Sequence, residues 1–214
     1  MPPRALSARK TPRQARSIET VRAILDASIQ VLRRRGLDRL TTTAVAERAN
    51  VSVGTLYQYF PNKRALLAEV LREHLGQVAD AVVNAARRTS GGSRRDIVAA
   101  VVAAFVTAKF SDAERSRVLY AVAGEVGGPG IVRAASERAR AALQQALASA
   151  SDAPRDETVQ ERERVAHMIA AMMVGPVQEG LAADAPAETA VQLSRELTLA
   201  VTGYLEQRRL ANSV

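Results

Sequence analysis

Apolar side chains recur every three or four residues along most of this chain, which is the period of a helix with one buried face. No sustained alternation of period two, which would indicate strands, lies between turn residues. The pattern therefore predicts an all-α fold. Between residues 17 and 35, for example, the expected buried stripe consists of Val21, Ile24, Leu25, Ser28, Val31 and Leu32.

Residues that interrupt helices divide the chain into segments. Gly36 can end the first helix, Pro61 disfavours a helical conformation at the residue before it, and the stretch 90–93 forms a further break. The Gly-Gly-Pro-Gly stretch at 127–130 lacks the Lys-Ser/Thr pair and the preceding strand of a phosphate-binding loop, so we interpret it as a helix break. The expected helices are 17–35 with Ser17 as cap, 41–49, 53–60, 62–86, 96–110, 114–125, 131–150, 158–181 with a kink at Gly175-Pro176, and 187–210.

Segment 41–63, TTTAVAERANVSVGTLYQYFPNK, contains two short helices separated by a tight turn. Asn50 tolerates the left-handed conformation that ends a helix, and Ser52 can cap the helix that follows. On this second helix Leu56 and Phe60 stand four residues apart and can anchor it to its own domain, whereas its other face is small or polar. The arrangement predicts a helix-turn-helix.

Positive charge is concentrated in the same part of the chain. Residues 1–64 hold 13 of the 30 Lys and Arg residues but 4 of the 22 Asp and Glu residues, so residues 65–214 are close to neutral. Such a step indicates a phosphate-facing module joined to a nearly neutral one. Residues 1–16, with three prolines and five basic residues, are expected to form a mobile arm that either contacts DNA or remains a solvated tail.

The composition argues against several classes of protein. Without cysteine, the chain has neither a disulfide framework nor a thiol nucleophile. It also lacks a nucleotide-binding loop, a His-x-x-x-His motif and paired carboxylates on an apolar face, so no enzyme activity, metal or cofactor is expected. We find neither an apolar run long enough to cross a membrane nor a signal peptide. The expectation of a cytoplasmic protein rests on the DNA-binding interpretation.

The helix-turn-helix segment resembles the DNA-binding domain of the TetR-like transcriptional repressors. The resemblance covers about residues 17–71, and the remainder is similar to the family in length and helical character. The sequence departs from the family pattern at Asn50, where glycine is common, and at Thr42 and Thr43, where apolar and basic residues are common. The motifs that carry the resemblance are Thr41, Val45-Ala46, Ala49, Val51-Ser52, Gly54-Thr55-Leu56-Tyr57, Tyr59-Phe60-Pro61 and Lys63.

Residue types on the predicted recognition helix favour contact with DNA. Gly54 allows the backbone close to the groove, Gln58 can pair with adenine, and Val53 or Tyr57 can pack against a thymine methyl group. By the resemblance, Tyr59 and Lys63 are expected to contact phosphates, which would set the register of the protein on the duplex. The predicted DNA-binding residues are Thr41, Thr42, Thr43, Ser52, Val53, Gly54, Thr55, Tyr57, Gln58, Tyr59 and Lys63.

The two C-terminal helices present apolar stripes at helical spacing. Either the stripes close the core of the chain itself or they pair with a second copy, and a helix-turn-helix that reads paired half-sites favours a homodimer through these helices. The stripes are Val165, Met168, Ile169, Met172 and Met173 on one helix and Val191, Leu197, Val201, Tyr204 and Leu205 on the other.

The resemblance implies a ligand pocket among the C-terminal helices. Few charges interrupt the apolar stretches there, so the expected effector is a hydrophobic or neutral small molecule. The same side chains could instead be plain core or surface residues. The candidate effector-binding residues are Phe105, Phe110, Tyr120, His167, Met168 and Met172.

These observations predict three parts of the chain: the arm at residues 1–16, a three-helix DNA-binding domain at 17–64, and a helical effector-binding and dimerisation domain at 65–214. The expected function is a transcriptional regulator, most simply a repressor that a small molecule releases from double-stranded operator DNA. The alternative is a nonspecific or architectural DNA-binding protein, which would show no preference among duplex sequences.

Overall fold

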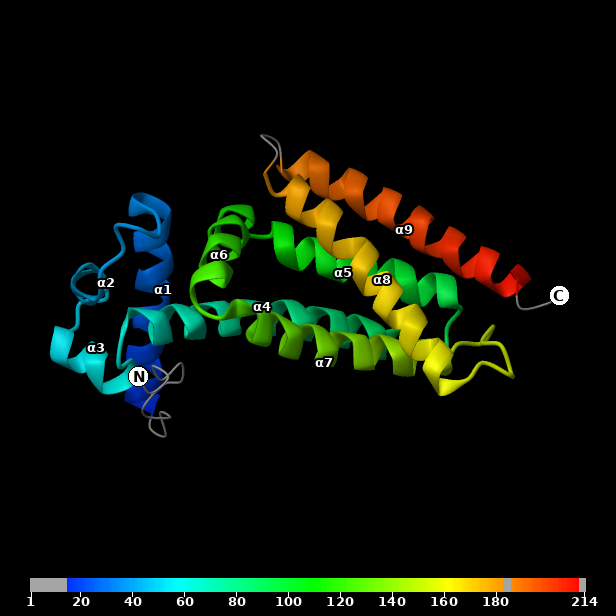
Figure 1. Ribbon diagram of the computed structural model, residues 1–214, viewed down its shortest axis with the longest axis horizontal. Coiled ribbons are helices and arrows are strands. Elements are labelled where there is room, and N and C mark those ends of the chain that lie inside the picture. Colours follow the sequence, from blue (N-terminus) through cyan, green and yellow to red (C-terminus); the bar gives the residue numbers. More distant parts are fainter. Residues whose placement is uncertain (1–14, 183–185, 212–214) are drawn as a thin grey trace. The chain divides into compact units, whose positions relative to one another are not determined.

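The structure, a computed structural model, describes residues 15–182 and 186–211, and every helix or strand in these ranges is an α-helix. The all-α prediction is thus confirmed for this part of the chain, whereas nearly all of the predicted arm at residues 1–16 lies outside it. The helices are α1 (Ala15–Arg35), α2 (Thr42–Arg48), α3 (Val53–Tyr59), α4 (Lys63–Arg88), α5 (Arg94–Phe110), α6 (Ala113–Glu125), α7 (Gly128–Ala148), α8 (Val159–Gly180) and α9 (Pro186–Ala211) (Figure 1).

Side-chain caps define where three of the N-terminal helices begin. Thr41 Oγ1 accepts a hydrogen bond from the Ala44 amide at 3.1 Å, so it caps α2. Ser52 Oγ accepts one from Thr55 at 2.9 Å, and Asn62 Oδ1 accepts one from the Ala65 amide at 2.8 Å. Each cap satisfies an amide that has no partner inside its helix, and all three predicted caps are confirmed.

Several helices begin earlier than predicted, among them α1, α5 and α7. Helix α1 already includes Ala15, so Ser17 lies inside the helix and the prediction that it is the cap is wrong. Helix α7 begins at Gly128, because a proline in the first turn gives up no intrahelical hydrogen bond. The predicted break at 127–130 is therefore reduced to Gly127, whose φ is 69°.

The chain forms two compact units. Unit 1 comprises the described residues up to Leu75 together with Glu114–Arg133, and unit 2 comprises Gly76–Ala113 together with the described residues from Ala134 onward. Helix α4 is continuous and contributes its first half to unit 1 and its second half to unit 2. The predicted domain boundary after residue 64 lies in the first turn of α4.

Unit 1 has a hydrophobic core built from α1, α2, α3, α4 and α6. The predicted anchors of α3, Leu56 and Phe60, are 0% and 1% exposed, which confirms their assignment to the core. Helix α6 contributes Leu119 and Val122 to the same cluster, and Val126, in the turn that follows α6, is also fully buried there. Helix α6 is therefore part of the packing that supports the helix-turn-helix.

Unit 2 is a bundle in which α9 packs against α5 and α8. Helices α8 and α9 run antiparallel (Figure 1). An ion pair between Arg94 and Glu157 joins the start of α5 to the loop before α8, and Arg138 on α7 pairs with Asp80 on α4. Among the described residues, no helix is long and apolar enough to span a membrane.

Candidate nucleic-acid interface

Helix α3 has one buried face and one exposed face. Leu56 and Phe60 hold it in the core of unit 1, whereas Gly54 and Gln58 are exposed and Tyr57 keeps 41% of its surface accessible. Because opposite faces of one short helix have opposite environments, α3 is fixed in place while it presents polar groups to solvent. This is the arrangement that a recognition helix requires.

The turn between α2 and α3 sets the angle of the recognition helix. Asn50 has a φ of 55°, a left-handed conformation that asparagine tolerates better than most residues. The next amide, that of Val51, donates to the carbonyl of Ala46 at 3.0 Å, and the side chains of Val51 and Val53 pack against the core. The predicted left-handed turn is thus confirmed.

Polar side chains on the exposed surface of α2 and α3 are joined by hydrogen bonds. Ser52 Oγ lies 2.8 Å from Thr55 Oγ1, so the cap of α3 also orients the Thr55 hydroxyl. Thr42 Oγ1 lies 3.0 Å from the Tyr57 hydroxyl and links the first turn of α2 to α3. The hydrogen bond between Thr42 and Tyr57 brings together two residues that were predicted separately as DNA contacts.

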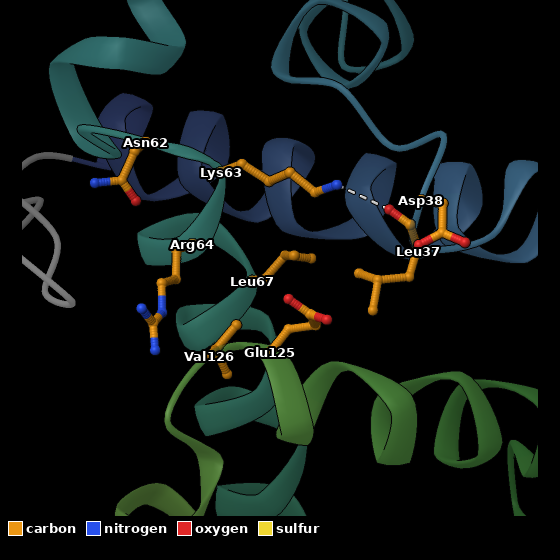
Figure 2. A pocket seen from close by; sticks show the side chains of 8 residues that line it. All are labelled: Leu37, Asp38, Asn62, Lys63, Arg64, Leu67, Glu125 and Val126. Atoms are coloured by element: carbon orange, nitrogen blue, oxygen red, sulfur yellow. Dashed lines mark hydrogen bonds between the residues drawn. The ribbon is translucent and has the colours of Figure 1, made fainter. Parts of the chain in front are cut away.

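Two residues predicted to contact phosphates lie in environments that the sequence did not predict. Tyr59 is 8% exposed and belongs to the core cluster, so only a small edge of its side chain reaches solvent. Lys63 Nζ donates to the carbonyl of Leu37 at 2.8 Å, as Figure 2 shows. An ammonium group carries three donors, so this bond leaves two for another acceptor.

A surface pocket of about 540 Å³ lies beside Lys63 in unit 1 (Figure 2). Its lining includes two cations, Lys63 and Arg64, and two carboxylates, Asp38 and Glu125. The charges of these four groups balance, so the pocket itself is not specialised for an anion. This pocket could not be predicted from the sequence, because α6, which supplies Glu125, is distant along the chain from Lys63.

Comparison with known proteins supports the arrangement of these helices. The model of the tetR family of bacterial regulatory proteins matches residues 24–70, and a model described as the tetracyclin repressor-like C-terminal domain matches residues 93–205. The second match alone covers more than half of the chain. The chain belongs to the tetR family.

Individual relatives of this TetR-family protein match it over part of its length. The transcriptional repressor KstR of Mycolicibacterium smegmatis is 47% identical over 53 residues, which are 25% of this chain and 26% of KstR. The transcriptional regulator BetI of Escherichia coli is 32% identical over 81 residues, which are 38% of this chain and 42% of BetI. The chain thus spans between about a quarter and two fifths of the length of these relatives.

Solved structures extend the similarity of the fold to most of the chain. A putative TetR-family regulator from Mesorhizobium loti has a TM-score of 0.69 at 19% identity and covers 90% of this chain and 98% of its own. The fatty acid degradation regulator FadR from Bacillus halodurans has a TM-score of 0.68 at 15% identity and covers 91% and 97%. At these identities the comparison shows the fold alone.

The six candidate effector-binding residues of this TetR-family protein do not share one environment. Phe105, Phe110 and Met172 are half-buried in unit 2, whereas Tyr120 lies on α6 in unit 1. Two are on the surface: Met168 is 45% exposed, and His167 Nδ1 lies 2.9 Å from Arg140 Nη1. Tyr120 is half-buried, and desolvation raises the pKa of its hydroxyl.

A groove of about 600 Å³ in unit 2 was not anticipated from the sequence. It lies between α5 and α9 and has an apolar lining that includes Val106, Val191 and Leu199, with Arg95 and Arg195 also at its surface. Hydrophobic periodicity alone indicates which side of a helix is apolar but not which two helices enclose a groove.

The predicted apolar stripes divide between the core and the surface. Six of the residues are buried inside unit 2, namely Val165, Ile169, Met173, Leu197, Val201 and Leu205. Met168 and Val191 remain 45% and 75% exposed, and Val174, Leu199 and Leu210, which the stripes omitted, are exposed as well. Helices α8 and α9 therefore close the core of the chain and still carry large apolar side chains at the surface.

Proposed function

We propose that this TetR-family protein is a transcriptional regulator, most simply a repressor, that binds operator DNA through α3 and is released by a small molecule. The observation that carries the proposal is the opposite exposure of the two faces of α3. Leu56 and Phe60 hold the helix, while Tyr57 and Gln58 face solvent. The family consists of regulators, and the proposal assigns no catalytic step to this chain.

The exposed residues have the chemistry that each proposed contact needs. Gln58 offers the paired donor and acceptor that match adenine. Tyr57, or the part of Val53 that its packing against the core leaves accessible, offers an apolar surface for a thymine methyl group. Ser52, Gly54 and Thr55 lie at the amino end of α3, where the helix approaches the groove. Phosphate contacts are assigned to Thr41, Thr42, Thr43, Tyr59 and Lys63, with Tyr59 limited to its exposed edge.

A dimer supplies the symmetry that a paired operator requires. Exposed Met168 on α8 and Leu199 on α9 support an interface through the two C-terminal helices. In such a dimer the recognition helices would be held about 34 Å apart, one turn of DNA, so a small displacement would weaken both half-sites together. Helix α4, continuous between the two units, is the element through which an effector in unit 2 would act.

The effector is proposed to be a hydrophobic or neutral small molecule. The half-buried Phe105, Phe110 and Met172 in unit 2 support this choice, because aromatic side chains commonly line ligand pockets and the flexible methionine thioether adapts to irregular apolar ligands. A compound found by thermal-shift screening can be titrated into the protein with and without operator DNA. Coupling between sites is reciprocal, so operator DNA should weaken the binding of the compound by the same factor as the compound weakens the binding of DNA. Equal affinities in the two titrations would contradict release by that compound.

Selection of bound sequences from a random duplex pool tests the central proposal. A regulator should enrich a palindromic site and prefer it over random DNA by about 4 to 10 kcal/mol. An architectural DNA-binding protein would enrich no site, and its affinity would depend on salt but not on sequence. A pool that remains random after selection would therefore contradict the regulator proposal.

A further inference from the structure

The hydrogen bond between Thr42 and Tyr57 joins the two kinds of surface that recognise DNA. Thr42 lies in the first turn of α2, where the proposed function places a phosphate contact, and Tyr57 lies on the exposed face of α3, where it places a base contact. Their oxygen atoms are 3.0 Å apart, a normal distance for two hydroxyl groups that share one hydrogen. Thr42 is half-buried, and Tyr57 is 41% exposed.

The chemistry of the partners gives this hydrogen bond a direction when DNA is present. Each hydroxyl group donates one hydrogen, whereas phosphate oxygens at neutral pH only accept. If Thr42 donates its hydrogen to a phosphate, its hydrogen is no longer available to Tyr57. Tyr57 must then donate to Thr42 Oγ1, and the two hydroxyl groups form a chain that ends on the phosphate.

We infer that Thr42 and Tyr57 act as a single recognition unit, in which Tyr57 donates to Thr42 and Thr42 donates to a DNA phosphate. The inference rests on the proposed function and adds the coupling of a phosphate anchor to a base-reading side chain. The bond holds the Tyr57 ring in one orientation before DNA arrives, so less side-chain freedom is lost on binding. Thr42 is thus a positioning residue for base recognition as well as a phosphate ligand.

A double-mutant cycle on the duplex selected from the random pool tests this coupling. Thr42→Val keeps the shape of the side chain and removes the phosphate contact, and we expect about tenfold weaker binding. Tyr57→Phe keeps the ring and the proposed contact of Thr42 with the phosphate but removes the hydrogen bond between the two side chains, and we expect about threefold weaker binding. The double variant should bind no more weakly than Thr42→Val, because the Tyr57 hydroxyl has no role once Thr42 is lost.

Matched variants separate this coupling from a loss of folding. Thr42→Ser retains the hydroxyl and should restore most of the affinity, and Thr107→Val makes the same replacement at an exposed position of α5 and should bind normally. Because no charge is removed, Thr42→Val should leave the salt dependence of binding unchanged while broadening the preference at one base position of each half-site.

Several results would overturn the inference. If the fold-losses of DNA affinity in the two single variants multiply in the double variant, the two residues act independently. If Tyr57→Phe weakens binding more than Thr42→Val does, the hydroxyl group that donates to the phosphate is that of Tyr57 and not that of Thr42. If the wild-type protein selects a palindrome but the variants give either of these results, the proposed function stands and only the inference fails. If the wild-type protein selects no sequence, both the proposed function and the inference fail.

Discussion

Gly54 has room for a larger side chain in the free protein. A Cβ atom at this position would have Ser52 Oγ as its nearest neighbour, at 3.7 Å, which is an ordinary contact. The φ of Gly54 is not in the left-handed region, because Gly36, Gly91 and Gly127 are the described glycines with positive φ. The fold of unit 1 therefore does not require glycine here, whereas the proposed close approach of α3 to DNA would.

Gly54→Ala should separate stability from DNA binding. Alanine favours a helix over glycine, so the free energy of unfolding should rise by up to about 1 kcal/mol. Operator affinity should fall, because the added methyl group stands where α3 approaches the groove. Denaturant unfolding and binding titrations measure the two effects. Gly124→Ala on α6, where no atom lies within 4 Å of the added Cβ, is the control that should leave DNA affinity unchanged. Unchanged operator affinity in Gly54→Ala would contradict the close approach.

Lys63 combines a structural contact with a proposed phosphate contact. Lys63→Ala should weaken binding to every duplex and reduce the slope of log affinity against log salt by about 0.9, the value for one phosphate. Arg88→Ala removes a cation at the other end of α4 and should leave the slope unchanged. If Lys63→Ala lowers the stability but not the slope, the bond from Lys63 to Leu37 is its main role.

At the scale of single residues, features that depend on neighbours in the sequence could be predicted better than features that depend on packing between separate helices. The caps Thr41 and Ser52 and the left-handed Asn50 depend on neighbouring residues, so they could be recognised from the sequence. The burial of Tyr59 and the bond from Lys63 to Leu37 depend on packing between separate helices, which a motif does not encode. The assignment of residues to DNA contact stays a prediction.

At the scale of elements, α5 carries a lysine whose charged form is disfavoured by burial. Lys109 is 5% exposed, and desolvation lowers its pKa from 10.5 to about 8. Below pH 8 both the folded and the unfolded chain hold the proton, and the folded state bears the full cost of burying the charge. Between pH 8 and 10.5 the unfolded chain binds the proton that the folded chain has released, so this residue makes stability rise with pH.

Lys109→Met should therefore stabilise the protein in a pH-dependent way. At pH 7 we expect the free energy of unfolding to rise by up to about 3 kcal/mol, and above pH 10.5 the gain should largely disappear. Denaturant unfolding of the variant and the wild type at both pH values measures the difference in their free energies of unfolding. Other groups that titrate, such as Tyr120 with its raised pKa, contribute equally to both proteins and cancel in this difference. Arg117→Met, which removes an exposed cation of α6, should show no such dependence. An equal gain at both pH values would contradict a desolvated charge.

At the scale of the whole molecule, the exposed apolar side chains of α8 and α9 support a dimer. Leu199→Glu would place two carboxylates in a symmetric interface, at a cost of several kcal/mol if they are buried without partners. Sedimentation should then show single chains of 22.9 kDa with an unchanged helical spectrum, and operator affinity should fall. Val132→Glu, at a position of α7 that is 41% exposed, is the matched control. A Leu199→Glu protein that remains dimeric would place the interface elsewhere.

The order of the helices could be predicted from hydrophobic periodicity, but their partners in packing could not. Periodicity marked Leu119 and Val122 as apolar without showing that they complete the core of unit 1. It also grouped Val165 and Ile169 with Met168, although the first two are buried and the third is exposed. The direction in which an apolar stripe faces depends on tertiary contacts, which a single sequence does not specify.

The contribution of α6 to the core of unit 1 has a practical consequence for dissecting the protein. A shortened gene product that stops at residue 75 would lack Leu119, Val122 and Val126, and the side chains they cover would be open to water. Such a piece would tend to aggregate or to bind chaperones, even though it retains every residue assigned to DNA contact. An isolated DNA-binding fragment would need the segment 114–133 attached to it through an artificial linker. Truncation alone therefore does not yield a stable DNA-binding domain.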